Sequence, residues 1–497
     1  MKLTKKVLAL SLSLAMASAM GVTTYAADVS TAATYSITID KAMGKYMAYQ
    51  VFKGDLSSSH VLSNVEWGDG VTPFKYDGTD DAAVIAQKLE AEANDSAAVK
   101  SFASLAASNV TSTYTEVNAS GGKAEITNLK PGYYVILNSN VADGEAISRY
   151  ILQVTKDQTI ENKASTPEFE KKIKDINDTT DDGFSGWQDS ADYDIGDEIP
   201  FQLKGTVAAN YSDYEKYYFA FHDVEEKGLT FDESTVEVSV DGAKIASNLY
   251  ELKTSNTDKC TFEVVFADLK TIDSVHAGSV ITVDYKSTLN SNAVLGEEGN
   301  VNKAKLEYSN NPNDSQGGKG STPWDNVIVF TYKVVINKVD GDNANAPLSG
   351  AEFTLSKKLK NGSIKDIAVV KNTAGTEFTF SGLDDGDYVL TETTTPSGYN
   401  TIDPITFTVT ADHDIVWTTQ DRNKVLTSLS GNKVKGEITL TADKKKGSLT
   451  SDVVNKSGST LPSTGGIGTT IFYVVGVILM LGAGVLLVTK KRMSSNR

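Results

Sequence analysis

The C-terminal end is the part of the sequence that most constrains how this chain can fold. Residues 466–488 form an uncharged apolar run, which as a helix would be about 34 Å long and would cross a bilayer. The basic residues that follow it are Lys490, Lys491, Arg492 and Arg497, and they predict a cytoplasmic C-terminus. We therefore expect a transmembrane helix over 466–488, a cytoplasmic basic tail over 489–497, and folded domains outside the membrane.

The N-terminus also predicts export. Three lysines precede the apolar segment Val7–Met20, which is too short to span a membrane and is followed by small residues. This pattern is typical of a secretory signal peptide. We expect residues 1–26 to be removed by cleavage after Ala26, with cleavage after Ala19 as the alternative.

The exported part is strongly acidic. It spans roughly 435 residues, too many for one hydrophobic core, so two to four domains are expected. The formal net charge of −17 becomes −24 once the three lysines of the signal peptide and the four basic residues of the tail are removed. Such a surface repels nucleic acid and anionic lipid, so neither is an expected partner.

The single cysteine, Cys260, excludes an internal disulfide. That is unusual for a long extracellular chain. Either the domains are stable without cross-links, or another kind of cross-link is used. Cys260 itself lies in an apolar stretch and is expected to be a small buried core residue.

No metal ion and no cofactor is expected. The four histidines, His60, His222, His276 and His413, are isolated in the sequence, which argues against a zinc site. The segment Asp175–Asp181 has a faint calcium-loop spacing, but Thr180 stands where such a loop requires glycine. We interpret that segment as a solvated acidic loop.

Short strands of alternating polarity predict an all-β protein of tandem immunoglobulin-like β-sandwich domains. The expected boundaries are 27–165, 166–326 and 327–456. The N-terminal domain carries a helical insertion, since Thr79–Leu89 and Asp95–Ala107 are rich in alanine and begin with capping residues. The strands expected in the other two domains are 200–203, 217–221, 236–240, 262–266, 280–285, 304–308, 332–338, 351–355, 377–380, 388–391, 405–410 and 438–440.

A weak internal repeat links the first and third domains. Residues 122–134 line up with 376–388, and both segments end in Leu-x-x-Gly-x-Tyr. Duplicated sandwiches of this kind predict separate domains arranged like beads on a string.

Polar side chains lie on apolar strand faces in the third domain. Because side chains alternate along a strand, Lys338, Glu392 and Asn455 each share a face with apolar residues of their own strand. If these faces point inward, the three polar groups enter one core. In the reversed register they are ordinary edge charges, and the pattern alone leaves both readings open.

The pentapeptide Leu461-Pro462-Ser463-Thr464-Gly465 stands directly before the apolar run. Together with that run and the basic tail, it resembles the LPxTG sorting signal of Gram-positive surface proteins. The resemblance implies that a sortase cleaves between Thr464 and Gly465 and that an amine then resolves the acyl-enzyme. That amine belongs either to a peptidoglycan precursor or to a lysine of another subunit. The alternative is a plain C-terminal membrane anchor.

Residues Tyr388–Tyr399 resemble the E-box of the collagen-adhesin B-type domains of Gram-positive pilins, with Thr395 in place of the usual alanine. The resemblance implies an isopeptide bond between Lys338 and Asn455, with Glu392 as its catalyst.

Three segments of the second domain, 168–175, 222–231 and 302–310, resemble the middle domain of major pilins. This resemblance implies a bond between Lys171 and Asn302, assisted by Asp223. The neighbouring lysines Lys172 and Lys174 are the competing candidates.

Burial gives such a trio its reactivity. Desolvation lowers the pKa of a lysine and raises that of a carboxylic acid, so a neutral amine beside a protonated acid is expected. The amine attacks the Asn side-chain carbonyl, the acid stabilises the tetrahedral intermediate, and ammonia leaves. Closing a loop of more than about 100 residues would stabilise each domain by about 5 kcal/mol on the loop-entropy account.

The first domain is expected to lack this bond. Residues 39–41 line up with 336–338, which pairs Lys41 with Lys338, and residues 160–162 line up with 453–455, which pairs Asn162 with Asn455. The position of Glu392, however, is taken by Asn138. Without the acid, the reaction should be slow or absent.

The whole layout resembles the backbone subunit of a sortase-assembled pilus. In that family the acceptor lysine lies in a Tyr-Pro-Lys-Asn-like motif at the end of the first domain. Lys163 stands at this place without the Tyr-Pro, and the alternative is an ordinary exposed linker lysine. The implied partners are a sortase, identical pilin subunits, minor pilins, peptidoglycan and a host surface ligand, in a cell-wall role that supports adhesion.

Other functions are kept as alternatives. They are a minor pilin, a monomeric wall-anchored adhesin and, in a different class, a surface enzyme. The sequence shows no nucleophile elbow, Cys/His pair or phosphate loop, so we expect the protein not to be an enzyme.

Overall fold

The computed structural model describes residues 33–93, 96–141, 145–180, 183–255, 258–312, 318–419 and 421–458, and five helical residues near the C-terminus: Val475, Val477, Leu479, Met480 and Ala483. Among these residues no helix is long and apolar enough to cross a membrane. The predicted signal peptide, sorting motif and cytoplasmic tail, and most of the predicted transmembrane helix, lie outside the described residues.

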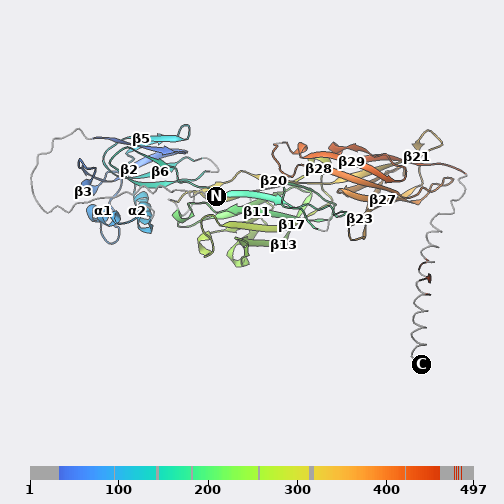
Figure 1. Ribbon diagram of the computed structural model, residues 1–497, viewed down its shortest axis with the longest axis horizontal. Helices are drawn as coiled ribbons and strands as arrows, with labels where there is room; N and C mark the ends of the chain where they lie inside the picture. The colour runs from blue at the N-terminus through green and yellow to red at the C-terminus, as the bar shows by residue number, and fades with distance from the viewer. Residues whose placement is uncertain are drawn as a thin grey trace, which may run out of the picture.

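Three β-domains follow one another along the long axis of the molecule (Figure 1). The N-terminal domain lies at one end, in blue, the middle domain is green, and the C-terminal domain is orange. The prediction of tandem β-sandwich domains is confirmed.

The N-terminal domain combines two sheets with two helices. Its strands are β1 (Tyr35–Asp40), β2 (Lys45–Leu56), β3 (Leu62–Trp67), β4 (Thr115–Asn118), β5 (Lys123–Leu129), β6 (Gly132–Ser139), β7 (Arg149–Val154) and β8 (Gln158–Glu161). One sheet has the order β5-β1-β8, and the other has the order β3-β2-β6-β7 with β4 paired to β2.

The helical insertion is confirmed, but its caps differ from the predicted ones. Helix α1 (Ala82–Glu90) is capped by Asp81 rather than Thr79, and α2 (Ala97–Ser108) by Ser96 rather than Asp95. Each capping side chain accepts hydrogen bonds from the backbone of the first turn. Phe102 of α2 is fully buried in one cluster with residues of α1 and β2, so the insertion shares a core with the sheet.

The middle domain is a sandwich of two facing sheets. Its strands are β9 (Glu168–Ile173), β10 (Ser190–Asp192), β11 (Glu198–Thr206), β12 (Phe219–Glu225), β13 (Leu229–Val240), β14 (Ala243–Lys244), β15 (Glu251–Lys253), β16 (Phe262–Phe266), β17 (Val280–Leu289), β18 (Asn300–Ser309), β19 (Lys319–Ser321) and β20 (Asp325–Phe330). The first sheet has the order β14-β13-β17-β11-β9. The second has the order β10-β20-β18-β12-β16-β15, with β19 paired to β18.

The C-terminal domain is also a two-sheet sandwich. Its strands are β21 (Tyr332–Asp340), β22 (Ala346–Pro347), β23 (Glu352–Lys358), β24 (Ile364–Ile367), β25 (Val369–Lys371), β26 (Glu377–Leu383), β27 (Gly386–Thr394), β28 (Ile405–His413), β29 (Leu426–Lys435), β30 (Thr441–Asp443) and β31 (Ser448–Asn455). The sheets have the orders β25-β26-β21-β31-β30, with β22 on β21, and β24-β23-β27-β28-β29. The strand predicted at 438–440 is wrong, because β30 begins only at Thr441.

The boundary predicted after Asn326 cuts through a strand. β20 pairs with β18 and with β10, both of the middle domain. The middle domain therefore extends to Phe330, and β21 starts the C-terminal domain at Tyr332.

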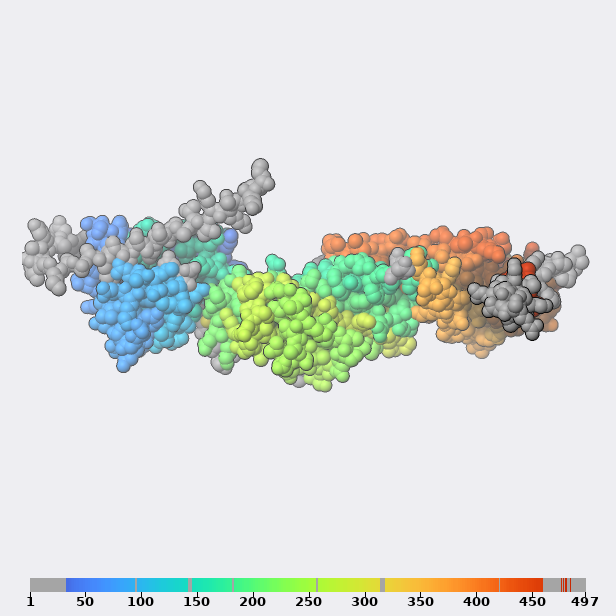
Figure 2. Space-filling model, turned by 60° about the horizontal axis from the view of Figure 1, so that its bottom comes forward, coloured from blue at the N-terminus to red at the C-terminus, as the bar shows by residue number. Residues whose placement is uncertain are grey.

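The middle and C-terminal domains are packed against each other rather than separate like beads. Ile328 and Phe330 of β20 belong to the same buried cluster as the core of the C-terminal domain. The guanidinium of Arg422 donates to both carboxylate oxygens of Glu226, at 2.8 and 2.7 Å, across this junction. Figure 2 shows the orange residues of the C-terminal domain lying along the green middle domain.

Candidate functional site

The predicted trio of the middle domain comes together in its core. Lys171 lies on β9 at the edge of one sheet, while Asp223 on β12 and Asn302 on β18 belong to the facing sheet. All three side chains are fully buried. The Lys171 amine Nζ donates to Asp223 Oδ2 at 2.5 Å. A bond from Lys171 to Asn302 would therefore join the two sheets.

Two further residues of this site, Tyr285 and Glu225, were not predicted from the sequence. The Tyr285 hydroxyl accepts from Lys171 Nζ at 2.7 Å and from Asn302 Nδ2 at 2.9 Å, and donates to Asp223 Oδ2 at 2.8 Å. Glu225 Oε1 accepts from Asn302 Nδ2 at 3.2 Å. Because side chains alternate along β12, Glu225 lies on the same face as Asp223, and this spacing could have predicted Glu225. Tyr285 lies on β17, in the sheet that faces β12, so no such spacing marks it.

Burial shifts the proton equilibria of this site in the direction that the reaction needs. It lowers the pKa of Lys171, against the opposing charge of Asp223, and it raises the pKa of Asp223, against the opposing charge of Lys171. Burial and the neighbouring Asp223 raise the pKa of Glu225 to about 8. Both shifts move the site toward an uncharged amine beside a protonated acid.

Two oxygens of the trio have no hydrogen-bond partner among the described residues. They are Oδ1 of Asp223 and Oδ1 of Asn302. A buried carbonyl oxygen without a donor is costly. A protonated Asp223 could donate to the Asn302 oxygen, as a catalyst of attack on the Asn302 carbonyl must.

The predicted trio of the C-terminal domain is also brought together. Lys338 on β21 and Asn455 on β31 are fully buried, and Glu392 on β27 nearly so. β21 and β31 are parallel neighbours, with Lys338 opposite Val453, so Asn455 lies two residues farther along the same face. Asn455 Nδ2 donates to both oxygens of Glu392, at 2.9 and 3.1 Å.

The amine of this second trio is held by backbone carbonyls. Lys338 Nζ donates to the carbonyls of Val339 and Val453, at 3.1 and 3.0 Å. Burial lowers the pKa of Lys338 to about 8, although Glu392 and Asp340 oppose the shift. At pH 7 about a tenth of this amine is then uncharged, against roughly one part in three thousand for an ordinary lysine.

The competing lysines of the middle domain face elsewhere. Lys172 is half-buried and donates to Asp189 Oδ1 at 2.7 Å. The Lys174 amine lies over the ring of Trp187, 4.7 Å from its centroid. The reading that places Lys171 inside is thereby confirmed, and so is the inward register of Lys338.

The N-terminal domain repeats the hairpin of the C-terminal domain. Tyr134 donates its hydroxyl to the Lys130 carbonyl at 2.9 Å, as Tyr388 does to the Asp384 carbonyl at 3.0 Å. Ile39 pairs with Ala124, and Ile336 pairs with Phe378. Because Ala124 and Phe378 hold the same position in the repeated hairpin, Lys41 corresponds to Lys338.

The predicted counterpart of Asn455, however, is wrong by two residues. Ile39 pairs with Ile160 on β8, whereas Ile336 pairs with Ser451 on β31. Asn162 therefore takes the place of Val453, and Ala164 takes the place of Asn455.

The other two positions are also unsuited to reaction. Asn138 is buried at the position of Glu392, and its Oδ1 accepts from the Ser148 backbone and hydroxyl. Lys41 lies exposed just beyond β1 and pairs with Glu161 at 3.5 Å. The three corresponding positions of the N-terminal domain, Asn138, Ala164 and Lys41, thus offer no acid, no side-chain amide in the place of Asn455 and no buried amine.

The predicted acceptor lies on the surface. Lys163 is exposed in the segment that joins β8 to β9, and its backbone N–H donates to the Tyr150 hydroxyl at 2.9 Å. Its predicted partner in the linkage, Thr464 of the sorting motif, lies outside the described residues.

The acidic segment predicted to be solvated is partly buried at the junction of the middle and C-terminal domains. Asp178 pairs with Lys357, a fully buried lysine that also contacts Asp194 and Asp384. These carboxylates raise the pKa of Lys357 even though burial alone would lower it. Unlike Lys171 and Lys338, Lys357 is therefore a permanent cation that holds two domains together.

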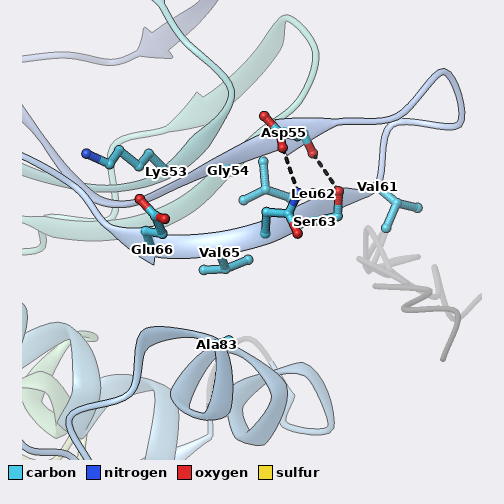
Figure 3. Close-up of a pocket in the computed structure, with 10 residues that line it drawn as sticks. Lys53, Gly54, Asp55, Val61, Leu62, Ser63, Val65, Glu66 and Ala83 are labelled. Carbon is cyan, nitrogen blue, oxygen red and sulfur yellow. Dashed lines mark hydrogen bonds between the residues drawn. The ribbon is translucent and has the colours of Figure 1, made fainter. Parts of the chain in front are cut away.

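An open groove of about 860 Å³ lies in the N-terminal domain between the β2–β3 hairpin and α1 (Figure 3). Lys53, Asp55 and Glu66 line it, with Asn64 Nδ2 donating to Asp55 Oδ2 at 2.8 Å. None of the predicted site residues is among its lining residues.

Comparison with known proteins agrees with this architecture. Residues 195–312 match the Gram-positive pilin backbone subunit 2, Cna-B-like domain. Residues 332–423 match the SpaA prealbumin-like fold domain, and residues 453–495 match the LPXTG cell wall anchor motif.

One similar protein is the trypsin-resistant surface T6 protein of Streptococcus pyogenes serotype M6. It is 26% identical over 394 residues, which cover 67% of this chain and 70% of the relative. Among solved structures, the T6 backbone pilin of serotype M6 Streptococcus pyogenes superposes with a TM-score of 0.58 at 19% identity, over 87% of this chain and 100% of that one. The major pilin SpaD of Corynebacterium diphtheriae gives 0.51 at 18% identity, over 86% and 98%. These two structures share the fold of this chain.

Proposed function

This chain is a homologue of the T6 backbone pilin that carries a pilin-backbone domain and an LPXTG cell-wall anchor, and we propose that a sortase polymerises it covalently into the shaft of a cell-surface pilus. In this polymer the Thr464 carbonyl of one subunit is joined to the Lys163 amine of another. The observation that supports this most is the exposed position of Lys163 between two domains in a chain that ends in an LPXTG anchor.

Each of the two buried trios forms one isopeptide bond within the folded subunit. The Lys Nζ–Cγ bond forms, the Cγ–Nδ2 bond of the asparagine breaks, and the amide nitrogen leaves as ammonia with the proton that the lysine gives up. Asp223 and Glu392 are the acids that stabilise the intermediate and transfer protons. Folding supplies the proximity, which suffices for a single turnover.

The two bonds would shorten the path along which tension crosses a subunit. Tension that enters at Lys163 reaches Lys171 after a few residues, crosses to Asn302, and runs on to Lys338. It then crosses to Asn455, six residues before Leu461. Residues 172–301 and 339–454 would not extend, and the N-terminal domain would lie off the path altogether.

In this role the protein is structural rather than enzymatic, and the pilin family that it matches is structural. Minor pilins and peptidoglycan would join the same polymer through sortase chemistry, and a host surface ligand would be bound by the assembled fibre. A minor pilin or a monomeric wall-anchored adhesin would share the anchor and the folded domains, but would not use Lys163.

Immunoblots of cell-wall extracts test the polymer. Wild type should give a ladder of high-mass species, and Lys163→Ala should leave monomer only. Lys156→Ala is the matched control, because Lys156 is an exposed lysine in the turn between β7 and β8. A single monomer band in wild type would favour a monomeric wall-anchored adhesin. A ladder that persists in Lys163→Ala would show that another lysine is the acceptor.

A further inference from the structure

The middle domain carries a second cluster of reactive side chains, on the outer face of the sheet that holds Asp223. His222 is the residue before Asp223 on β12, so its side chain lies on the opposite face. It pairs in register with Glu263 of β16. The turn before β16 adds Asp258 and Cys260. Strands far apart in the sequence thus bring together one imidazole, one thiol and two carboxylates.

The four candidate ligand atoms lie within 4.8 Å of one another. His222 Nδ1 is 3.0 Å from Asp258 Oδ2, 3.5 Å from Glu263 Oε1 and 3.6 Å from Cys260 Sγ. Cys260 Sγ is 3.1 Å from Asp258 Oδ2. Around tetrahedral zinc, with bonds of about 2.0 to 2.3 Å, neighbouring ligand atoms stand about 3.3 to 3.6 Å apart. These four pairs match that spacing to within a few tenths of an ångström, and the remaining two pairs lie within 4.8 Å.

Three of the four residues in the cluster are buried, and the fourth reaches the solvent. His222, Cys260 and Glu263 are buried residues, whereas Asp258 is exposed. The other imidazole nitrogen, Nε2 of His222, is buried and makes no hydrogen bond among the described residues. It lies 3.8 Å from Glu307 Oε2 on β18. A carboxylate at the far nitrogen of a ligating histidine is a recurrent feature of zinc sites.

We propose that His222, Asp258, Cys260 and Glu263 bind one zinc-class divalent cation, with Glu307 orienting the imidazole from behind. Nitrogen, sulfur and carboxylate oxygen are the ligands that zinc takes in proteins, and four of them complete a closed structural site. Binding releases the thiol proton to solvent, so that the thiolate is the ligand.

The charges around His222 favour a cation. Asp258 and Glu263 lie 3.0 and 3.5 Å from Nδ1 of His222, and Glu307 lies 3.8 Å from Nε2. Lys319 pairs with Glu307 at 3.1 Å. Carboxylates outnumber that cation around the imidazole, and a divalent ion would offset their negative charge.

Such an ion would stabilise the strand that bears the isopeptide acid. The backbone N–H of Thr261 donates to the Asp223 carbonyl at 2.7 Å, next to Cys260 in the sequence. The ion would tie the 258–260 turn and β16 to β12 on one face, while the proposed Lys171–Asn302 bond ties the sheets on the other. In a chain without disulfides it would be a cross-link independent of the isopeptide bonds.

Metal titration of the full-length chain in detergent, reduced and stripped with a chelator, tests the proposal. Zinc should bind with a stoichiometry of one by isothermal titration calorimetry, and cobalt(II) should give a cobalt–thiolate charge-transfer band. Cys260→Ser should abolish that band and weaken zinc binding at least tenfold. Glu307→Gln should keep the band and weaken binding about 10- to 100-fold.

The matched control is His276→Gln, because His276 is an exposed histidine that lies 3.8 Å from a carboxylate, Asp241, outside the cluster. It should bind zinc as wild type does. Circular dichroism of each variant confirms folding before titration. Absence of stoichiometric zinc binding in wild type, or equal binding by Cys260→Ser, would overturn the proposal and reduce the cluster to a hydrogen-bonded one.

Discussion

The N-terminal and C-terminal domains share a hairpin and its tyrosine turn, yet only the C-terminal domain holds a buried lysine, acid and asparagine together. In the C-terminal domain β31 continues two residues past Val453 alongside β21 and so places Asn455 on the face of Lys338. In the N-terminal domain β8 ends at Glu161, and Ala164 falls at that position. The difference teaches that the trio depends on the length of the last strand as much as on the acid.

The two domain junctions also differ, and the one that involves the C-terminal domain is the more extensively buried. The N-terminal domain meets the middle domain through contacts such as Lys100 with Asp213, at 2.9 Å, and the Ile147 N–H with the Asn310 carbonyl, at 2.7 Å. The middle and C-terminal domains share a buried apolar cluster and the buried cation Lys357. The reinforced part of the molecule is the part that lies between Lys163 and the sorting motif.

Removal of the acid in the middle domain should have the largest effect. Asp223→Asn should leave a subunit heavier than the cross-linked one by one ammonia, after allowance for the substitution. Its free energy of unfolding should fall by about 5 kcal/mol from the lost loop closure, and further because buried Lys171 loses its partner. Intact-mass spectrometry and calorimetry measure both. Asp273→Asn, at an exposed aspartate, is the control, and an Asp223→Asn subunit with the cross-linked mass would exclude Asp223 as the catalyst.

The same change in the C-terminal domain should have a similar but slightly smaller effect. Glu392→Gln should raise the mass by one ammonia relative to the cross-linked chain and lower the free energy of unfolding by about 5 kcal/mol. The shape of the side chain is kept, and Lys338 retains its two backbone acceptors. Glu377→Gln, on an exposed position of β26, should change neither quantity. An unshifted mass in Glu392→Gln would contradict the proposed role of Glu392.

The junction of the middle and C-terminal domains should weaken as pH rises. Burial raises the pKa of Asp385 to about 6. Burial would lower the pKa of His413, but its hydrogen bond to Asp175 and the charges of Asp192 and Asp385 raise it above 6.5. Both groups bind protons more tightly in the folded state, so their stabilising effect is present at low pH. For Asp385 it is lost between about pH 4 and 6, and for His413 from about pH 6.5 upward through its folded pKa.

Thermal unfolding between pH 5 and 8 checks this expectation. The melting temperature of the unit formed by the middle and C-terminal domains should fall over that range, and His413→Gln should flatten the part above about pH 6. His276→Gln replaces an exposed histidine and should leave the slope unchanged. Equal slopes in wild type and His413→Gln would show that His413 does not govern the junction.

Restoring only the acid to the N-terminal domain should have the smallest effect. Asn138→Glu should cause no further loss of ammonia, after allowance for the substitution, because Ala164 offers no amide and Lys41 is exposed. Loss of a further ammonia in this variant would show instead that the acid alone was missing, and would overturn the register argument. Asn138→Asp, whose side chain is shorter, provides a matched comparison.

Much of the site could be predicted because its signals are local. The alternation of side chains placed Lys338, Glu392 and Asn455 on faces shared with apolar residues, and the structure buries all three. Tyr285 could not be predicted in the same way, because it reaches the trio of the middle domain from β17, a strand that holds none of the three residues. Nothing near Tyr285 in the sequence marks that contact.

The sequence by itself determined the strand periodicity, the three-domain order and the pentapeptide before an apolar run. Each of these follows from patterns among neighbouring residues. Only the tertiary structure decided the two-residue offset that removes Asn162 from the trio, the burial of Lys357 between domains, and the meeting of His222 with Cys260. Strand register and domain contacts are set by residues far apart in the chain, and a one-dimensional pattern specifies them weakly.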